Sequence, residues 1–432
     1  MKRFNVTGLC IPEEHYMVDI SEKIKQIRKL IDNECYFTIN RARQYGKTTT
    51  LNELEKSLTG EYIVASISFE GLGSTEFASD ENFCLTLMSK IQRALEFTSE
   101  DPDYIEKWLD YNITTFDLLN IHITKMCKNK KIILMIDEVD KTSSNSIFLH
   151  FIGMLRDKFL LRGRGKDYTF HNVILAGVYD IKNIKLKLIN EGLYKPSETE
   201  NKMYNSPWNI AIDFEIDMSF NPAEIATMLI DYEKDHNTGM NITELSEEIY
   251  SYTNGYPFLV SRICQHINDK LNKDWSKYGI QQAVKIILYE ASTLFDDLIK
   301  NIRAYPDLRN FLYELLFIGE EKSFNIDNAS ISLGCMFGFL KESNSKVKVD
   351  NRIFEIRIYN YFVEGEPATG KRIVGMSSDI IKNGKLDMEL CLRKFAEYYA
   401  EIFSPRDAGF LEQQARKVFL MYIKPMINGE GF

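Results

Sequence analysis

Two short segments of the chain carry the residue types that bind a nucleoside triphosphate together with a metal ion. The first runs RARQYGKT from Arg41 to Thr48 and matches the end of the phosphate-binding consensus G-x-x-x-x-G-K-[ST], with Arg41 in place of its first glycine. Backbone amides in such a loop, and in the first turn of the helix behind it, attract phosphate oxygens. The segment therefore predicts a P-loop that departs from the consensus at its first position.

The P-loop prediction gives a role to individual side chains. Lys47 is expected to bridge the β- and γ-phosphates of ATP and to act in catalysis. The Thr48 hydroxyl is expected to bind Mg²⁺, an ion that keeps several waters and takes few protein ligands. The expected nucleotide contacts of this segment are Arg43, Gln44, Tyr45, Gly46, Lys47, Thr48 and Thr49. Because Gly-Lys-Thr also occurs at ordinary turns, its setting in the chain has to decide between the two interpretations.

The second segment is the apolar run IILMIDE, which ends in Asp137 and Glu138. An acidic pair after a buried strand is typical of the site that completes a P-loop. Asp137 would join the magnesium shell, and Glu138 would orient and deprotonate the attacking water. The alternative is a helix N-terminus behind the strand, where the helix dipole favours carboxylates. Both segments on one chain favour a site for ATP and Mg²⁺.

Hydrophobic periodicity predicts the elements that must hold these residues. CYFTIN, from Cys35 to Asn40, is strand-like, and it is followed by the P-loop and by the helical stretch LNELEKSL. Further strands are predicted at Tyr62 to Phe69, Lys131 to Ile136, Asn172 to Val178 and Asn209 to Ile216. Strands that alternate with helices predict a parallel, doubly wound α/β sheet. The strand between the two motifs, together with Glu138, indicates the additional-strand, catalytic-glutamate type of P-loop NTPase, with sheet order 5-1-4-3-2.

Beyond Phe220 the pattern changes to helices, predicted at Pro222 to Lys234, Ile242 to Tyr252 and Phe258 to Lys273. The segments VKVDN and FEIRIYNYF read as two strands joined by a turn at Asp350-Asn351, which suggests a winged-helix-like unit. A loop is expected at Glu364 to Gly384, and Leu386 to Ile427 is expected to be helical apart from a break at Ser404-Pro405. The predicted domains are a P-loop ATPase domain at 1–220, a helical lid at 221–300, a winged-helix-like region at 301–365 and a helical C-terminal segment at 366–432.

Three further residues are candidates for the nucleotide site. Tyr179 ends the fourth predicted strand, where such ATPases place a polar residue that senses the γ-phosphate; an aromatic at the edge of the core is the alternative. Arg262 follows the Gly255-Tyr256-Pro257 turn and could read the γ-phosphate, although proline in a first helical turn explains that turn equally well. Arg162 is the choice among Arg156, Arg162 and Arg164 for an arginine finger supplied to a neighbouring subunit. A solvated basic helix end is its alternative.

Composition limits the class of protein. The chain has 432 residues, which exceeds a single core, and a net charge of -9, which argues against a protein that coats nucleic acid. The basic cluster from Arg162 to Lys166 and the lysines at 182, 185 and 187 leave local DNA binding open, although charge runs are usually solvated faces. Seven scattered cysteines indicate neither disulfides nor a zinc site, and no segment resembles a signal peptide or a membrane span. We expect a cytoplasmic protein without membrane contact.

Several segments together resemble the bacterial AAA-ATPase-like family: FTINRARQYGKTTTL, LMIDEVDK, HNVILAGVYDIKN, SPWNIAIDF and NGYPFLVSRIC. The resemblance covers nearly the whole chain and implies a P-loop ATPase module, a helical lid and a winged-helix-like region. It also implies that Tyr16 and Asp19 precede the first strand where related proteins build an adenine pocket, with core packing as the other role for Tyr16. Family members commonly continue into a nuclease-like PD-(D/E)XK domain, whereas this sequence stops at Phe432, so nuclease activity is not expected of it.

Three functions are compatible with these residues. The first is a Mg²⁺-dependent ATPase that couples hydrolysis to conformational change or to the regulation of a partner or nuclease-like domain. The second is a slow-hydrolysing nucleotide switch or scaffold, and the third is a DNA-binding protein with a vestigial P-loop. Self-association is open under the first two. Phosphate release by variants of Glu138 and Lys47 would separate them.

Overall fold

The computed structural model describes residues 2–99, 101–139, 146–178, 208–318, 322–364, 381–382, 385–402 and 419. Its chain forms two compact units. Unit 1 comprises Met1–Tyr250 and Gly255–Gln265, and unit 2 comprises Ser251–Asn254 and His266–Phe432. The four domains predicted from the sequence divide the chain more finely and stay predictions. No helix in the described part of the chain is long and apolar enough to cross a membrane.

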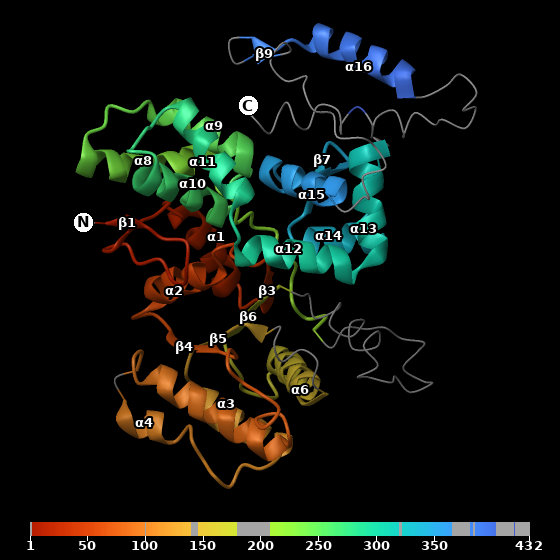
Figure 1. The fold of residues 1–432 in the computed structure, drawn as a ribbon. Coiled ribbons are helices and arrows are strands. Elements are labelled where there is room, and N and C mark those ends of the chain that lie inside the picture. Colours follow the sequence, from red (N-terminus) through yellow and green to blue (C-terminus); the bar gives the residue numbers. More distant parts are fainter. Residues whose placement is uncertain are drawn as a thin grey trace. The chain divides into compact units, whose positions relative to one another are not determined.

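Unit 1 is built on a parallel sheet of four strands in the order β3-β6-β5-β4 (Figure 1). The strands are β3 (Phe37–Asn40), β4 (Ile63–Ser68), β5 (Ile132–Asp137) and β6 (Asn172–Gly177). The register pairs Phe37 with Ile174 and Ser68 with Asp137, so the carboxyl ends of the strands share one edge. Strand β3 therefore delivers the P-loop to the edge at which β5 delivers Asp137 and Glu138.

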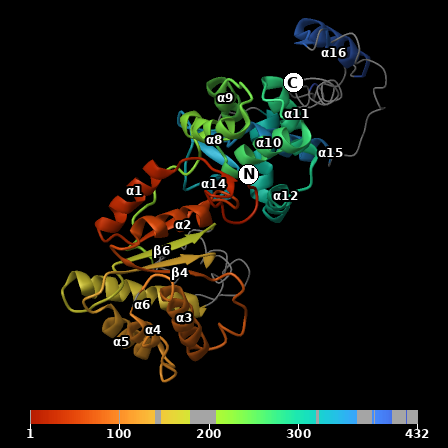
Figure 2. The same cartoon turned by 90° about the vertical axis from the view of Figure 1, so that its left-hand side faces the viewer.

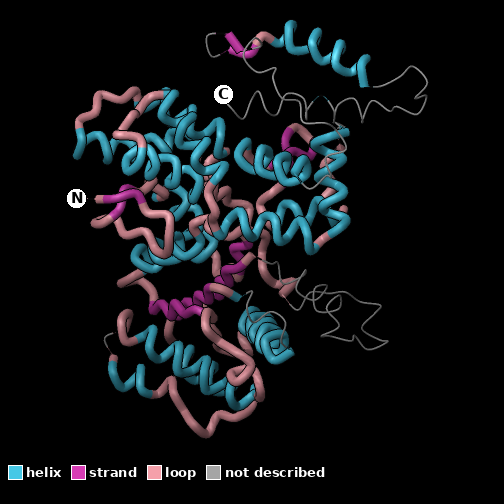
Figure 3. The backbone as a smooth tube through the Cα atoms, in the orientation of Figure 1, coloured by secondary structure: helices cyan, strands magenta, loops and turns pink. Residues whose placement is uncertain are grey.

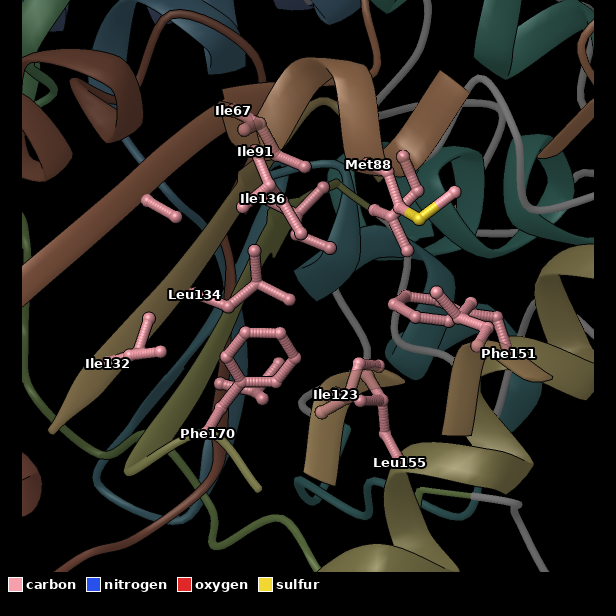
Figure 4. Packing of buried hydrophobic residues seen from close by; sticks show 14 of the residues in the cluster. Ile67, Met88, Ile91, Ile123, Ile132, Leu134, Ile136, Phe151, Leu155 and Phe170 are labelled. Atoms are coloured by element: carbon pink, nitrogen blue, oxygen red, sulfur yellow. The ribbon is translucent and has the colours of Figure 1, made fainter. Parts of the chain in front are cut away.

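The apolar run of β5 explains why the sheet is covered on both faces. Ile132, Leu134 and Ile136 belong to one core cluster, and Ile133 and Met135 belong to another. Alternate residues of a strand point to opposite faces, so a strand without polar alternation needs a packed layer on each side. Figure 4 shows Ile132, Leu134 and Ile136 in a row that faces Met88, Ile91, Ile123, Phe151, Leu155 and Phe170.

Helices supply these two layers. One face carries α1 (Ser21–Asp32) and α2 (Lys47–Leu58), and the other carries α3 (Asp80–Leu95), α4 (Pro102–Glu106), α5 (Phe116–Cys127) and α6 (Ser146–Gly163) (Figure 2). Polar caps begin three of them: Ser79, Asp101 and Thr115 each accept a backbone N–H of the first turn through a side-chain oxygen. The layers hold the strand ends, and with them the P-loop, in a fixed frame.

The helices predicted after Phe220 are present. They are α8 (Pro222–His236), α9 (Ile242–Thr253) and α10 (Pro257–Lys270). A capping box begins α8, because the Asn221 side chain accepts from the Glu224 amide while the Glu224 side chain accepts from the Asn221 amide. Two short parallel strands, β1 (Arg3–Phe4) and β2 (His15–Tyr16), lie against α8, where Tyr16 and Tyr232 pack with ring centroids 5.1 Å apart.

One predicted strand is not formed. Asn209 to Ile216 begins as a turn and contributes a single parallel bridge, Ile212 to Phe37, on the free edge of β3. The carbonyls of Phe214 and Ile216 are instead occupied by the guanidinium of Arg41. A side chain thus takes the acceptors that a strand ladder would use, which limits pairing to one residue. The bridge lies beside β3, where a fifth strand of the order 5-1-4-3-2 would lie.

Unit 2 is mainly helical in its described part (Figure 3). Its elements are α11 (Lys277–Tyr289), α12 (Thr293–Ala304), α13 (Pro306–Tyr313), the π-helical turn η3 (Glu314–Ile318), α14 (Ala329–Met336), β7 (Leu340–Ser343), β8 (Lys346–Val349), α15 (Arg352–Glu364), β9 (Ile381–Lys382), β10 (Lys385–Leu386) and α16 (Met388–Ile402). Residues 365–380 of the predicted loop and the predicted break at Ser404-Pro405 lie outside the described residues.

The predicted hairpin in unit 2 is shifted by one element. Strand β8 pairs with β7, not with FEIRIYNYF, and the turn lies at Asn344-Ser345, whose φ values of 53° and 61° suit a tight hairpin. FEIRIYNYF is part of α15, so its prediction as a strand is wrong. Its β-branched and aromatic residues suit a strand, but Phe354, Ile358 and Phe362 recur every fourth residue and are all buried.

Candidate functional site

The P-loop connects the carboxyl end of β3 to the first turn of α2. Within it, Gln44 has φ 56° and the N-cap residue Gly46 has φ 78°, so two of its residues are in the left-handed region. Such left-handed positions curl the backbone and let successive amides converge on an anion. The backbone at Arg41 has no positive φ, which explains why the first glycine of the consensus can be replaced.

Lys47 is anchored beneath the start of this loop. Its side chain is buried, and Nζ donates to the carbonyl oxygens of Arg41 at 2.9 Å and Ala42 at 3.0 Å. A buried ammonium needs such partners because leaving it unpaired costs several kcal/mol. The two bonds tie the lysine to the backbone at the start of the P-loop, and its contact with phosphate stays a prediction.

Thr48 and Asp137 meet across the sheet edge. The Thr48 hydroxyl donates to Asp137 Oδ2 at 2.7 Å, and Asp137 Oδ1 accepts the Glu138 amide at 2.8 Å. Thr48 is exposed and Asp137 is buried, so the pair opens to solvent on one side. One hydroxyl and one carboxylate at this spacing fit the few protein ligands that Mg²⁺ takes beside water and phosphate.

Glu138 follows directly and is half-buried, with φ 57°. A non-glycine residue in the left-handed region costs free energy, and such residues cluster at functional sites. Its backbone amide is tied to Asp137, so its position relative to the Thr48–Asp137 pair is set locally. The structure therefore brings Lys47, Thr48, Asp137 and Glu138 to one edge of the sheet.

Arg41 has a role that its sequence position did not suggest. Its guanidinium donates to the carbonyls of Asn40 at 2.9 Å, Ile216 at 2.8 Å and Phe214 at 3.4 Å, and it lies 5.4 Å from the centroid of the Phe214 ring. Burial lowers the pKa of this guanidinium, while Tyr45 and Asp217 act in the opposite direction. The side chain that replaces a glycine thus joins the P-loop to the segment that leads to α8.

The turn Gly255-Tyr256-Pro257 at the start of α10 packs on the P-loop. The Tyr256 hydroxyl donates to the Arg43 carbonyl at 2.5 Å, and the Tyr256 ring meets the Tyr45 ring at 4.7 Å with an interplanar angle of 74°. Gly255 has φ 72°, and a Cβ there would lie 1.9 Å from the Phe220 carbonyl oxygen. The sequence showed the turn but not the tyrosine contact.

The other residues predicted to contact the nucleotide lie on several elements. Thr49 Oγ1 accepts the backbone N–H of Cys10 at 3.3 Å, which brings the N-terminal segment to the start of α2. Arg43 is exposed, and Arg262 donates to Gln265 Oε1 at 2.7 Å within its own helix. Tyr179 and the lysines at 182, 185 and 187 lie outside the described residues.

Arg162 lies at the other edge of the sheet. It donates to the carbonyls of Phe170 at 2.6 Å and His171 at 2.8 Å, just before β6, and its guanidinium is 3.5 Å from the Glu34 carboxylate. These contacts are with the amino ends of the strands, opposite the P-loop of the same chain. A finger acts on a neighbouring subunit, so this placement does not test the prediction.

Tyr16 and Asp19 have structural contacts. Tyr16 is 3% exposed, and its hydroxyl donates to Asp235 Oδ2 at 2.8 Å. Asp19 accepts the Ser21 amide at 2.9 Å at the start of α1, and the hydroxyl and amide of Ser21 lower the pKa of that carboxyl. Core packing is thus the role that the contacts of Tyr16 support.

Comparison with known proteins gives a consistent picture of the fold. The sequence model of a family described as AAA-like domain matches residues 13–363. No curated protein matches the sequence. A solved Walker-type ATPase of Pyrococcus abyssi is similar with a TM-score of 0.56 and 13% identity, over 82% of this chain and 99% of that one.

Two other solved structures are less similar. The ORC2 protein of Aeropyrum pernix in its ADP form has a TM-score of 0.41 and 12% identity, over 83% of this chain and 96% of that one. The ORC1 protein of the same organism in complex with DNA has a TM-score of 0.33 and 10% identity, over 82% and 94%. At these TM-scores neither structure supports a conclusion about this chain. The Walker-type ATPase, at 13% identity, supports a shared fold and nothing beyond it.

Proposed function

The chain belongs to the AAA-like domain family, and from that premise we propose that it is a Mg²⁺-dependent ATPase that couples nucleotide state to conformational change. The observation that carries the proposal is the Thr48–Asp137 hydrogen bond of 2.7 Å. It joins the end of the P-loop to the end of the acidic strand, two motifs that lie 89 residues apart in the sequence. Family membership, the fold and the setting of both motifs support the same assignment.

Phosphate binding follows from the loop and its lysine. Left-handed backbone at Gln44 and Gly46 is the conformation that allows successive amides to converge on an anion, and the N-terminus of α2 adds a favourable dipole. Lys47, whose ammonium donates to the carbonyls of Arg41 and Ala42, would turn its charge to the β- and γ-phosphates when a nucleotide binds. The loop is thus prepared for a triphosphate before one arrives.

Metal binding and water activation fall to the neighbouring residues. Thr48 and Asp137 would hold Mg²⁺, which would neutralise charge on the β- and γ-phosphate oxygens when bound. Glu138 would orient the attacking water and take its proton. Because its backbone is fixed through Asp137, Glu138 is aimed by the same residue that would hold the metal.

The finer assignments remain part of the proposal. They are the sheet order 5-1-4-3-2, the winged-helix-like region, the roles of Tyr179 and Arg262 as γ-phosphate sensors and of Arg162 as a finger, and the regulation of a partner or nuclease-like domain. The contact of Tyr256 with the P-loop favours conformational coupling, since it lets an element beyond the sheet respond to the loop. It is compatible with fast turnover and with a slow switch.

The test is Mg²⁺-dependent phosphate release together with nucleotide affinity. Glu138→Gln removes the base but keeps the size of the side chain, so turnover should fall about 10²- to 10⁴-fold while ATP still binds. Lys47→Ala should abolish binding. Phosphate release is measured at saturating ATP with and without Mg²⁺. ATP affinity is measured by calorimetry without Mg²⁺, so that hydrolysis does not intervene.

A matched control is Glu61→Gln, which makes the same acid-to-amide change in unit 1 at a residue that pairs with Arg28 at 2.6 Å. It should leave both readouts unchanged. A wild type that binds ATP but releases no phosphate would replace the ATPase by a nucleotide switch. A wild type that binds no nucleotide would refute the proposal.

A further inference from the structure

One peptide bond of the P-loop is held from outside the loop. The Tyr256 hydroxyl donates to the carbonyl of Arg43, which precedes Gln44. A trans peptide unit is planar, with its C=O and the following N–H pointing in opposite directions. A carbonyl of Arg43 that faces Tyr256 therefore turns the Gln44 amide away from Tyr256 and toward the other side of the loop.

Gln44 needs such a constraint because its backbone is unfavourable. Its φ of 56° lies in the left-handed region, which a residue other than glycine occupies at a cost unless its surroundings enforce it. The carbonyls of Arg41 and Ala42 are held by Lys47, and that of Arg43 by Tyr256. The lysine comes from the loop's own helix, whereas the tyrosine directly precedes α10 and lies 213 residues beyond Arg43 in the chain.

Tyr256 itself is rigidly placed. It is fully buried, and its ring packs edge-on against Tyr45 at 4.7 Å. On its N-terminal side, Gly255 accepts the Phe220 amide at 2.8 Å, and no side chain fits at residue 255. A Cβ on Gly46, the N-cap residue of α2, would lie 4.0 Å from Pro257, so the turn also lies against the start of α2. The hydroxyl can follow the loop only if this whole turn moves.

We propose that Tyr256 is a positioning residue of the phosphate site: its hydroxyl fixes the Arg43 carbonyl and thereby directs the Gln44 amide to the phosphates. Phosphate affinity then depends on whether the start of α10 is docked on the loop, and nucleotide binding favours the docked state by the same free energy. This inference rests on the proposed function, since it assumes that the loop binds nucleotide.

The test is Tyr256→Phe, which removes one oxygen and keeps the buried ring. ADP and pyrophosphate should each bind about 3- to 10-fold more weakly, the loss expected for one hydrogen bond. Adenosine, which has no phosphate, should bind to the wild type and to the variant with equal affinity. For ATP hydrolysis, KM should rise while kcat stays close to the wild-type value, because the amide contact is made in both the ground state and the transition state.

The matched control is Tyr104→Phe. The Tyr104 hydroxyl also donates to a backbone carbonyl, that of Met126 at 2.9 Å, and the residue is also buried, but it belongs to α4 on the far side of the sheet. It should lose thermal stability as Tyr256→Phe does and keep the wild-type affinity for ADP and pyrophosphate. A merely structural role for Tyr256 would make the two variants alike in every readout.

The outcomes are separable. Unchanged ADP affinity in Tyr256→Phe, with wild-type ADP binding intact, overturns the inference and leaves the proposed function in place. Weakened ADP binding with unchanged pyrophosphate binding also overturns it, since the effect would then not act on the phosphates. Absence of ADP binding in the wild type would instead refute the proposed function.

Discussion

At the scale of single residues, the substitution of Arg41 for a consensus glycine is compensated by its side chain. Arg41→Gly restores the consensus, yet we expect it to weaken the protein. The part-buried carbonyls of Asn40 and Ile216 lose their donor. A fully buried acceptor left unsatisfied costs about 1–3 kcal/mol, and water can replace part of that loss here. The free energy of unfolding should fall. ADP affinity should fall with it, because the guanidinium would no longer fix the backbone at residue 41, whose carbonyl accepts from Lys47.

Urea unfolding and ADP calorimetry measure these two effects. Arg41→Lys is the matched variant: it keeps the charge but lacks the planar fork that reaches several carbonyls, so it should lie between wild type and Arg41→Gly. Tighter ADP binding by Arg41→Gly at unchanged stability would show that the bonds from the Arg41 guanidinium to the backbone carbonyls are not needed.

The sequence allowed Lys47, Thr48, Asp137 and Glu138 to be placed together because each motif is local and the strands deliver both to one edge. Arg41 and Tyr256 could not be assigned in this way. Their acceptors lie 175 and 213 residues away in the chain, and no local periodicity encodes such a pairing. The first glycine was expected from the consensus, whereas the backbone at residue 41 never needed it.

At the scale of elements, buried strands and amphipathic helices could be predicted, and the exceptions have identifiable causes. Strand-like composition concealed α15, although its buried residues follow a helical period and Asn351 precedes it. The Asn351 side chain accepts the backbone N–H of Phe354 at 2.9 Å, which is a helix cap. The polar pair Asp350-Asn351 thus starts a helix where a hairpin turn was predicted.

Removing this cap should loosen α15. Asn351→Ala is expected to cost about 0.5–2 kcal/mol, because the first-turn amide loses its acceptor. Hydrogen exchange of the α15 amides should accelerate accordingly, whereas Asn351→Ser, which keeps an acceptor oxygen, should exchange at nearly the wild-type rate. Equal exchange rates of the α15 amides in the alanine and serine variants would show that the Asn351 side chain does not stabilise this helix.

At the scale of the whole molecule, composition indicated a multi-core globular protein, and the division into two compact units agrees with that expectation. The exact division could not be read from the sequence. One of its boundaries separates Gln265 from His266 within α10, where the helical pattern continues without a composition shift. Compact units are defined by which residues pack together over long sequence distances. Hydrophobic periodicity shows that a residue is buried but not which distant residue it packs against.

Acid should destabilise unit 1 through His122. Burial lowers its pKa below 6.5, although the Trp108 carbonyl and Asp110 raise it and Lys125 lowers it further. The unfolded chain therefore binds a proton that the folded chain resists, so this contribution to stability is complete above pH ~6.5 and is lost as the pH falls toward the folded-state pKa. Urea unfolding should give a smaller free energy of unfolding at pH 5.5 than at pH 7.5. The slope is about 1.4 kcal/mol per pH unit for each extra proton bound on unfolding.

His122→Gln should reduce the slope of the unfolding free energy against pH. The same change at the exposed His150 should leave that slope in place. Equal slopes in wild type and both variants would rule His122 out as the cause.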